Sequence, residues 1–248
     1  MNFGFLSTLD NLLLPYIIKK AKNIGIKNIF VFLDEKGESK KDKKIFQKRT
    51  KGRFGDNNKS NDYLPALSNL NVPFYFVNNH NSDLSIELYS LLKIDCLINA
   101  GTPRKISKKL LNFEIIPQGV LNLHPGKLPE YRGCSAVEWA ILNDDQIFNT
   151  VHYMEEDYDT GPLIRTEPYQ FESNSTYVDI RSKVYLKGIN LLCDMVKKIQ
   201  NKEISYKDAQ KQNDLKAQYW DPIPKNLEDS SIEKANSKMY TYQNLGNK

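Results

Sequence analysis

The chain has 248 residues, of which 40% are hydrophobic and 26% charged, so it is long enough for one sizeable domain with an appendage and is not a disordered segment. Its three cysteines are widely spaced and include no C-x-x-C pair, which argues against a disulfide framework and against a zinc-knuckle metal site. The longest apolar run is too short to cross a bilayer and no secretory signal opens the chain, so we expect a cytoplasmic protein without a membrane partner.

The formal net charge of +5 comes from one part of the chain. Residues 34–60 contain ten lysines and arginines against five acidic residues, so the remainder is neutral overall. We interpret this stretch as a basic loop. It is either a solvated insertion or a clamp on a polyanionic substrate, because cationic side chains at the edge of a cleft attract phosphates.

Strands and helices alternate through the first hundred residues. The apolar pattern predicts strands at 3–6, 28–33, 73–77 and 95–99, with helices at 11–23, 61–70 and 82–93. This order predicts an α/β fold with a mostly parallel sheet. The first turn has no glycine-rich phosphate cradle, so Ser7 and Thr8 either meet a phosphate at a helix N-terminus or cap that helix. His80 lies in a polar turn, and we expect it on the surface.

A polar pair ends the next predicted strand, at residues 120–123. Pro125 and Gly126 stop this strand, because proline lacks an amide donor and glycine opens the left-handed region of backbone space. Side chains two positions apart leave the same face of a strand, so Asn122 and His124 point into the same space. An amide donor beside an imidazole suits acyl transfer, which needs an oxyanion stabilised and a proton moved. The alternative is a turn asparagine and a histidine packed beneath a loop.

An acidic loop follows a predicted strand at 150–153 and can bring Asp159 to the same strand ends. We interpret His152 as a structural residue of the sheet. Cys134 is an alternative nucleophile with His124 as its base, although Asn122 and Asp159 account for a site without it. The rest of the pattern predicts helices at 105–111, 135–142 and 177–198, strands at 163–171 and 206–212, and a polar tail from about residue 200.

Three ordered motifs resemble the formyltransferases that use 10-formyltetrahydrofolate. They are Ala100-Gly101-Thr102-Pro103-Arg104-Lys105-Ile106, then Asn122-x-His124-Pro125-Gly126 with Leu128-Pro129-x-Tyr131-Arg132-Gly133, and finally Thr150-Val151-His152 with Asp159-Thr160-Gly161-Pro162. The resemblance covers roughly residues 95–170. It implies a Rossmann-like formyltransferase fold with a mostly parallel central sheet, a catalytic domain at 1–200 and a short C-terminal extension at 201–248.

The same resemblance implies the site residues. Asn122, His124 and Asp159 match the family's catalytic set, and 10-formyltetrahydrofolate is the implied co-substrate. The matched folate-binding positions are Pro103, Arg104, Ile106, Met154, Glu156 and Tyr158, and the matched substrate-binding position is Gly126. The sequence departs from the family at Asp157-Tyr158, where a glycine is frequent, and this leaves the conformation of the loop open.

The acceptor amine belongs to one of three classes in this family. Glycinamide ribonucleotide formyltransferases carry an N-terminal glycine-rich phosphate loop that this sequence lacks. Methionyl-tRNA formyltransferases carry a large C-terminal domain, for which residues 201–248 are too few. The chain most resembles the sugar N-formyltransferases, which have a core of this size with a short C-terminal extension, and this resemblance implies an N-formyltransferase that acts on the amino group of a small-molecule, nucleotide-linked amino sugar. The alternative is an enzyme like the glycinamide ribonucleotide or methionyl-tRNA formyltransferases, so the acceptor amine stays open.

Two other interpretations remain. One is a hydrolase that releases formate from 10-formyltetrahydrofolate. The other is a nucleic-acid-binding module built on an inactive core and using residues 40–53, against which the intact set of Asn122, His124 and Asp159 argues. The sequence leaves open the sugar and the nucleotide, the roles of the basic loop and the C-terminal extension, and the oligomeric state, for which a homodimer is one option.

Overall fold

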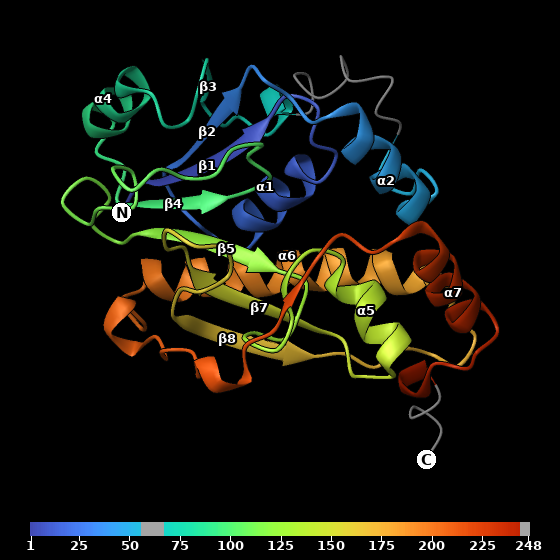
Figure 1. The fold of residues 1–248 in the computed structure, drawn as a ribbon. Helices are drawn as coiled ribbons and strands as arrows, with labels where there is room; N and C mark the ends of the chain where they lie inside the picture. Colours follow the sequence, from blue (N-terminus) through green and yellow to red (C-terminus); the bar gives the residue numbers. More distant parts are fainter. Residues whose placement is uncertain (56–66, 244–248) are drawn as a thin grey trace.

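The computed structural model describes residues 1–55 and 67–243. Its centre is a seven-stranded sheet with the order β3-β2-β1-β4-β5-β7-β8 (Figure 1). The strands are β1 (Phe3–Thr8), β2 (Ile29–Asp34), β3 (Phe74–Val77), β4 (Cys96–Asn99), β5 (Val120–His124), β7 (Phe148–Tyr153) and β8 (Leu163–Pro168). The first five run parallel, β7 is antiparallel to β5, and β8 is antiparallel to β7. The predicted α/β class with a mostly parallel sheet is confirmed.

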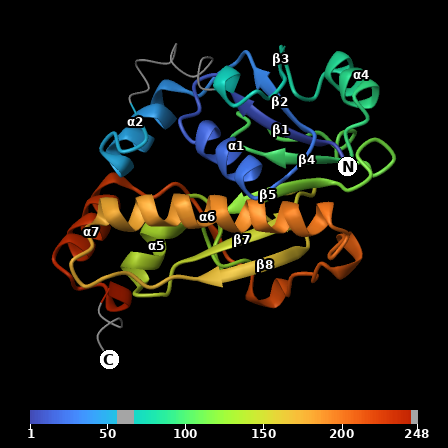
Figure 2. The same ribbon diagram turned by 180° about the vertical axis from the view of Figure 1, so that it is seen from behind.

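Strand β1 lies between two layers of helices. All six of its residues are buried, as expected for a parallel strand that is covered on both faces. Phe3 joins a core with α1 (Leu14–Asn23) and α6 (Tyr177–Gln200), which lie side by side across one face of the sheet (Figure 2). Leu6 joins a second core, on the other face, with residues of α4 (Asp83–Leu91).

The basic stretch contains a helix where we predicted a loop. Helix α2 (Lys40–Thr50) begins after Ser39, whose side chain accepts a hydrogen bond from the amide of Asp42. Phe46 packs against the ring of Tyr185 in α6, with the ring centroids 5.4 Å apart. A cap at its start and an aromatic contact with α6 therefore stabilise this helix, although its sequence is rich in lysine.

Two further element predictions are wrong, and a third lies largely outside the described residues. Residues 105–107 are irregular and 108–111 form a turn where we predicted a helix. Residues 206–212 form no continuous strand and contain a short 3-10 helix (Tyr206–Asp208) and a single bridge between Gln210 and Leu163. Of the helix predicted at 61–70, only 67–69 are helical within the described part. None of the described helices combines the length and the apolar composition that a membrane span requires.

The residues that follow α6 pack back onto the rest of the chain. Helix α7 (Lys225–Asn236) lies against α5 (Ala136–Asn143), and Tyr240 is buried in the same core. The short strand β9 (Tyr219–Trp220) pairs with β6 (Arg132–Gly133) in a separate two-stranded sheet. Residues 201–243 are therefore in contact with the segment that follows β5.

Candidate active site

Four polar side chains meet at β5, β7 and the loop that follows β7. The antiparallel register places Asn122 opposite His152, and their side-chain nitrogens Nδ2 and Nε2 are 3.0 Å apart. His124 lies two residues further along β5, with Nδ1 3.4 Å from a carboxylate oxygen of Asp159. The Nε2 atom of His152 lies 3.6 Å from the other oxygen. The structure thus brings together Asn122, His124 and Asp159, as the sequence predicted, and adds His152.

Hydrogen bonds on both sides hold the Asn122 amide in one orientation. Its oxygen accepts from the side-chain amide of Asn99 at 2.9 Å. The Nδ1 atom of His152 lies 2.7 Å from the carbonyl oxygen of Tyr153, so Nδ1 donates there and Nε2 accepts from Asn122. Among the described residues, the second N–H of Asn122 has no partner, and it can donate to a group in the cavity that Asn122 lines.

The His124 ring is placed to accept a proton at Nδ1. Its Nε2 lies 2.5 Å from the carbonyl oxygen of Tyr131, so the neutral ring carries its hydrogen at Nε2 and a lone pair at Nδ1. Burial lowers the pKa of His124, and the negative charge of Asp159 opposes that decrease. The ring is therefore neutral near pH 7, and a proton gained at Nδ1 is stabilised by the carboxylate.

Asp159 is held as a carboxylate. Burial alone would raise its pKa, but the two histidine rings and a hydrogen bond of 2.8 Å from the amide of Gly133 outweigh burial and lower the pKa to about 2. The backbone of Asp159 has a φ of 58°, which is uncommon for a residue with a side chain. At Gly161 a Cβ would lie 1.9 Å from the carbonyl oxygen of Tyr153, so this position requires glycine. The tight turn returns Asp159 to the strands.

These buried groups predict a loss of stability in acid. The folded pKa of His124 lies below its value of about 6.5 in an unfolded chain, so unfolding takes up a proton as the pH falls below that value. Asp159 contributes a second phase, because its pKa of about 2 lies below the unfolded value of 3.8. About 2 kcal/mol of stability that is present above pH ~4 is lost as the pH falls toward ~2. Glu38, whose pKa is raised to about 7, acts in the opposite direction above pH ~4.5, and Asp10, Asp34 and Asp179 add to the acid decrease. The contribution of Asp159 is therefore measured by urea unfolding as the difference between the wild type and Asp159→Asn, and a difference that does not change between pH ~5 and ~2 would contradict its shift.

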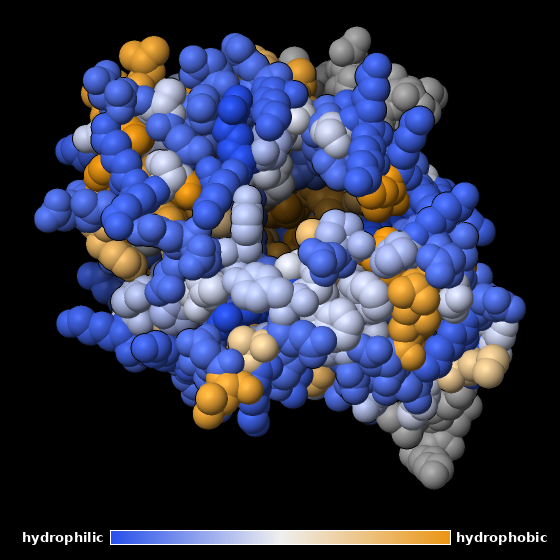
Figure 3. All heavy atoms as spheres, in the orientation of Figure 1, coloured by the Kyte–Doolittle hydropathy of each residue, from blue (hydrophilic) through white to orange (hydrophobic). Residues whose placement is uncertain are grey.

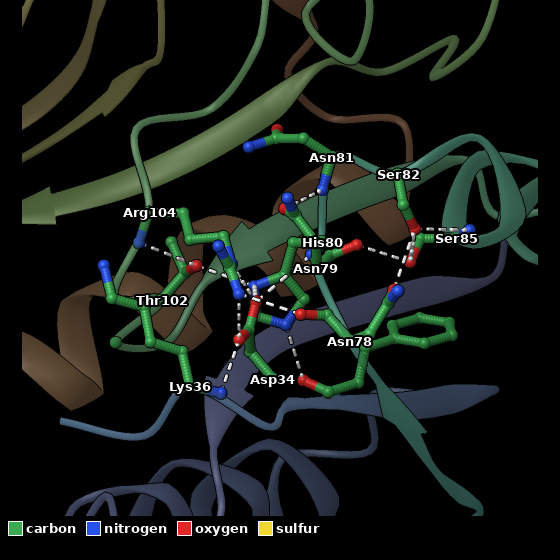
Figure 4. A network of polar contacts seen from close by, with 12 residues as sticks. Asp34, Lys36, Asn78, Asn79, His80, Asn81, Ser82, Ser85, Thr102 and Arg104 are labelled. Carbon is green, nitrogen blue, oxygen red and sulfur yellow. Dashed lines mark hydrogen bonds and ion pairs between the residues drawn. The ribbon is translucent and has the colours of Figure 1, made fainter.

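A second polar network supports the loop that the sequence predicted to bind folate (Figure 4). The carboxylate of Asp34, at the end of β2, accepts hydrogen bonds from the guanidinium of Arg104 and from the amide of His80. The His80 ring donates from Nε2 to the carbonyl of Phe32 at 3.0 Å and accepts at Nδ1 from the hydroxyl of Thr102 at 2.6 Å. The network therefore fastens Thr102 and Arg104 to the sheet.

The prediction that His80 lies on the surface is wrong. Its side chain is fully buried, and burial lowers the pKa of the ring. The polar residues 78–81 indicated a turn, and the chain does turn there. The sequence did not show that Asp34 and Thr102, which are distant along the chain, cover the ring.

Replacing Asp34 with alanine is expected to destabilise the protein. The side chain of Asp34 is fully buried and that of Arg104 is 23% exposed, so Asp34→Ala leaves a partly buried guanidinium without its partner. We expect a loss of about 2–3 kcal/mol and a fall in Tm of roughly 5–10 °C, measured by calorimetry. Asp83→Ala is the control, because the Asp83–Lys109 ion pair is largely exposed and its loss should leave Tm nearly unchanged. Equal effects in the two variants would contradict a supporting role for the network.

A cavity of about 550 Å³ opens beside the four-residue cluster. Its wall includes every position that the sequence predicted for folate, namely Pro103, Arg104, Ile106, Met154, Glu156 and Tyr158. Asn122, His152 and Asp159 line it as well. The side chain of His124 is only 5% exposed and contacts Asp159, so it reaches the cavity through that carboxylate.

A second cavity, of about 570 Å³, is formed largely by α2 and adjoins the first. Thr102 and Pro103 line both, and Lys36 and Lys41 bring positive charge to the second. An apolar pocket of about 280 Å³ lies between α1 and α6 and also reaches Asn122. Figure 3 shows a hollow with an apolar floor in the middle of this face. The Asn122 amide thus borders cavities on two sides.

Three candidate residues from the sequence have other surroundings than expected. Gly126 is not among the residues that line these three cavities. It packs against His124, and a Cβ at position 126 would lie 2.7 Å from Nε2 of that ring. Cys134 lines two cavities, but burial raises the pKa of its thiol, so it is no ready nucleophile near neutral pH. Ser7 is buried and donates to the carbonyl of Ala100, so its hydroxyl does not face a phosphate site.

His152 is the site residue that the sequence interpretation missed. The sequence predicts a structural residue of the sheet, and His152 does lie in β7, but its ring also accepts a hydrogen bond from Asn122 and approaches Asp159. The pairing of β5 with β7 would have indicated this contact, because that register sets the two side chains opposite each other.

Comparison with known proteins identifies the family. The model of the formyl transferase family matches residues 7–196, and because this is more than half of the chain, the protein belongs to that family. Curated relatives include the methionyl-tRNA formyltransferases of Clostridium tetani, 28% identical over 144 residues, and of Borrelia turicatae, 33% identical over 125 residues. These matches cover 58% and 50% of this chain and 45% and 40% of the relatives, so the chain spans about half the length of the curated relatives it matches.

Solved structures share the fold at low sequence identity. An N-formyltransferase from Helicobacter canadensis, crystallised with folinic acid and dTDP-3-aminofucose, matches with a TM-score of 0.63 at 16% identity and covers 95% of this chain and 80% of that chain. A glycinamide ribonucleotide transformylase from Symbiobacterium toebii matches with a TM-score of 0.60 at 16% identity, and the match covers 86% of this chain and 94% of that chain. The expected Rossmann-like formyltransferase fold is confirmed.

Proposed function

We propose that this protein is an N-formyltransferase that moves a formyl group from 10-formyltetrahydrofolate to the amino group of a nucleotide-linked amino sugar. One observation carries the proposal. The hydrogen-bonded cluster of Asn122, His124, His152 and Asp159 borders the cavity bounded by residues 102–106, and Asn122 also lines the apolar pocket between α1 and α6. The apolar pocket shares Phe46, Thr102 and Tyr185 with the cavity at α2, so an acceptor held there can reach the Asn122 amide through this pocket while the formyl donor occupies the first cavity.

The chemistry of the first cavity fits a folate. Pro103, Ile106 and Met154 offer apolar surface for a flat heterocycle. Residues 155–159 lie outside any strand or helix, so their peptide N–H groups can donate hydrogen bonds along its edge, whereas the carbonyls of residues 157–159 accept from side chains of this protein. When bound there, 10-formyltetrahydrofolate supplies the carbon that the amine attacks.

Asn122 is the group that stabilises negative charge on the formyl oxygen. Its amide is held by Asn99 on one side and His152 on the other, so the remaining N–H is oriented before the reaction begins. A donor that needs no reorientation lowers the barrier where charge develops in an acyl transfer. His152 acts in this scheme by orienting Asn122.

The attacking amine must lose a proton, and the pair of Asp159 and His124 accepts it. Asp159 lines the cavity and is ionised, because its pKa is about 2. The lone pair on Nδ1 of His124 lies 3.4 Å from the carboxylate, so a proton that reaches the pair is shared with the ring. The same pair returns a proton to the departing nitrogen.

The second cavity favours a nucleotide sugar as the acceptor. Lys36, Lys41 and Arg49 line it together with Glu38 and Asp42, and burial raises the pKa of Glu38 to about 7, which reduces the opposing negative charge. The two lysines can therefore pair with a diphosphate, and the rings of Phe46 and Tyr185 offer apolar faces to a sugar or a base. Its volume of about 570 Å³ is in the range of small-molecule sites. The similar N-formyltransferase from Helicobacter canadensis, crystallised with dTDP-3-aminofucose, supports this class of acceptor.

Methionyl-tRNA is the second candidate acceptor, because the curated relatives described above are methionyl-tRNA formyltransferases. The charges around α2 favour the smaller acceptor. Four basic side chains of this region form ion pairs within the chain, namely Lys43 with Asp10, Lys48 with Glu228, Arg49 with Glu138 and Arg53 with Asp179. Cations that are neutralised within the protein contribute little to nucleic-acid binding.

A panel of acceptors tests the proposal. The protein is incubated with 10-formyltetrahydrofolate and, in turn, amino-sugar nucleotides, glycinamide ribonucleotide and initiator methionyl-tRNA, and each acceptor is examined by mass spectrometry for one added formyl group. We expect formylation of an amino-sugar nucleotide and of neither other acceptor. Transfer to methionyl-tRNA alone would favour the second candidate, and formate release without transfer would identify a hydrolase. Salt-dependent RNA binding without turnover would indicate an inactive binding module.

A further inference from the structure

The side chain of Gln212 connects the segment after α6 to the loop that carries Asp159. Gln212 is only 6% exposed, and its side-chain amide makes four hydrogen bonds. Its oxygen accepts from Nε and from a terminal nitrogen of Arg132, at 3.1 and 2.8 Å. Its nitrogen donates to the carbonyl oxygens of Asp159 and Gly161, each at 2.8 Å. Both donors and both acceptor positions of the amide are used.

The two carbonyls that Gln212 binds flank the tightest part of the loop. Asp159 has a φ of 58°, in the left-handed region that favours glycine, so an attachment is needed to keep it there. The neighbouring hydroxyl of Tyr219 donates to the carbonyl of Tyr158 at 2.7 Å, and Gln210 exchanges two backbone hydrogen bonds with Leu163. Residues 210–219 therefore hold the loop at several points.

The carboxylate of Asp159 depends on the same segment from its other side. It accepts a hydrogen bond from the amide of Gly133 in β6, and β6 is paired with β9. Gly133 has a φ of 95°, and a Cβ there would lie 2.4 Å from the carbonyl oxygen of Trp220, so the two backbones are in close contact. Both the main chain and the side chain of Asp159 are thus placed by residues that follow α6.

We propose that Gln212 is a positioning residue for Asp159 and that residues 210–220 complete the active site of this protein. The amide holds the loop in the conformation that sets the carboxylate 3.4 Å from His124 and 3.6 Å from His152. The predicted effect of Gln212 on turnover rests on the proposed function, whereas its predicted effect on the position of Asp159 does not. The two effects call for separate measurements.

The first measurement is an NMR titration of the histidine rings. The chain has three histidines, so each ring signal can be assigned by substitution. The charge of Asp159 supports protonation of His124, so displacing the carboxylate in Gln212→Met should move the titration midpoint of His124 to lower pH. The buried ring of His80 belongs to the Asp34 network and serves as an internal reference that should not move.

A second variant and a matched control complete the test. Gln212→Asn retains an amide that can still meet Arg132 but is too short to span both carbonyls, so it remains informative where Gln212→Met does not fold. Gln200→Leu is the control, because it removes an amide that accepts from Lys27 and donates to Gly25 at the far end of α6. We expect the control to leave the midpoint of His124 at its wild-type value. An unchanged midpoint in both Gln212 variants would overturn the proposal.

Turnover is the second measurement. With the acceptor identified in the panel above, we expect the Gln212 variants to lower kcat by about 10- to 100-fold, because small displacements of reacting groups have effects of this size. The KM for 10-formyltetrahydrofolate should rise by a smaller factor than kcat falls, because the displaced loop carries Tyr158 and Asp159 of the cavity wall whereas Pro103 and Ile106 are retained. A Gln212 variant with wild-type kcat would contradict a positioning role. Absence of transfer by the wild-type protein would instead reject the proposed function and leave the NMR result valid.

Discussion

Asn122→Ala is expected to lower kcat by about 100- to 1000-fold, the usual effect of removing a preorganised oxyanion donor. The side chain makes hydrogen bonds with Asn99 and His152, and it borders the cavities on both sides of the cluster. Alanine keeps the strand but leaves no donor for the formyl oxygen. The KM for 10-formyltetrahydrofolate should change little, because the lost interaction strengthens in the transition state. Steady-state kinetics with the formylated acceptor would measure both quantities.

The control for this prediction separates catalysis from folding. Removing Asn122 leaves the buried ring of His152 and the half-buried amide of Asn99 without this partner, which costs about 1–3 kcal/mol of stability, so Tm is recorded for every variant. Asn201→Ala changes an exposed asparagine at the end of α6 that bonds to Glu203, and it should retain wild-type kinetics. A kcat for Asn122→Ala near that of Asn201→Ala would refute the role of Asn122.

Asp159→Asn is expected to lower kcat by about 100- to 10 000-fold, the range for loss of a general acid–base group. Asparagine keeps the size of the side chain and an oxygen that can accept from Gly133. It removes the charge that stabilises a proton on His124, and the pKa of that ring should then fall further below its ordinary value. The acid limb of the rate profile, where it reports His124, should therefore shift to lower pH.

Asp194→Asn provides the matched control for this charge. Asp194 is an exposed residue of α6, 4.0 Å from Lys20, and its neutralisation should leave both the rate and the pH profile unchanged. The stability data offer an independent check, because Asp159→Asn should reduce the decrease in unfolding free energy below pH ~4, while Asp10, Asp34 and Asp179, whose pKa values are also lowered, keep their share of it. An Asp159→Asn enzyme with a wild-type rate and pH profile would exclude the proposed proton transfer.

Predictions from the sequence succeeded where neighbouring residues decide the structure. The apolar run of β5 and the helical spacing of apolar residues in α6 can each be read from one continuous stretch of sequence, and both elements form as expected. The prediction of a loop in the basic stretch was wrong, because helix α2 is stabilised by the contact of Phe46 with Tyr185, which lies far along the chain. The prediction that His80 lies on the surface was wrong for the same reason, since the residues that contact it, Asp34 and Thr102, are distant along the chain.

The sequence by itself determined that Asn122 and His124 share one side of a strand, because the two-residue repeat of an extended chain is a local property. It also marked Asp159 through a motif, and the structure brings that carboxylate to both histidines. Only the tertiary structure decided that His152 lies against Asn122, and that Gln212 holds the loop of Asp159. These contacts depend on strand register and on the path of the chain after α6. Both result from packing the whole molecule, so no short stretch of sequence encodes them.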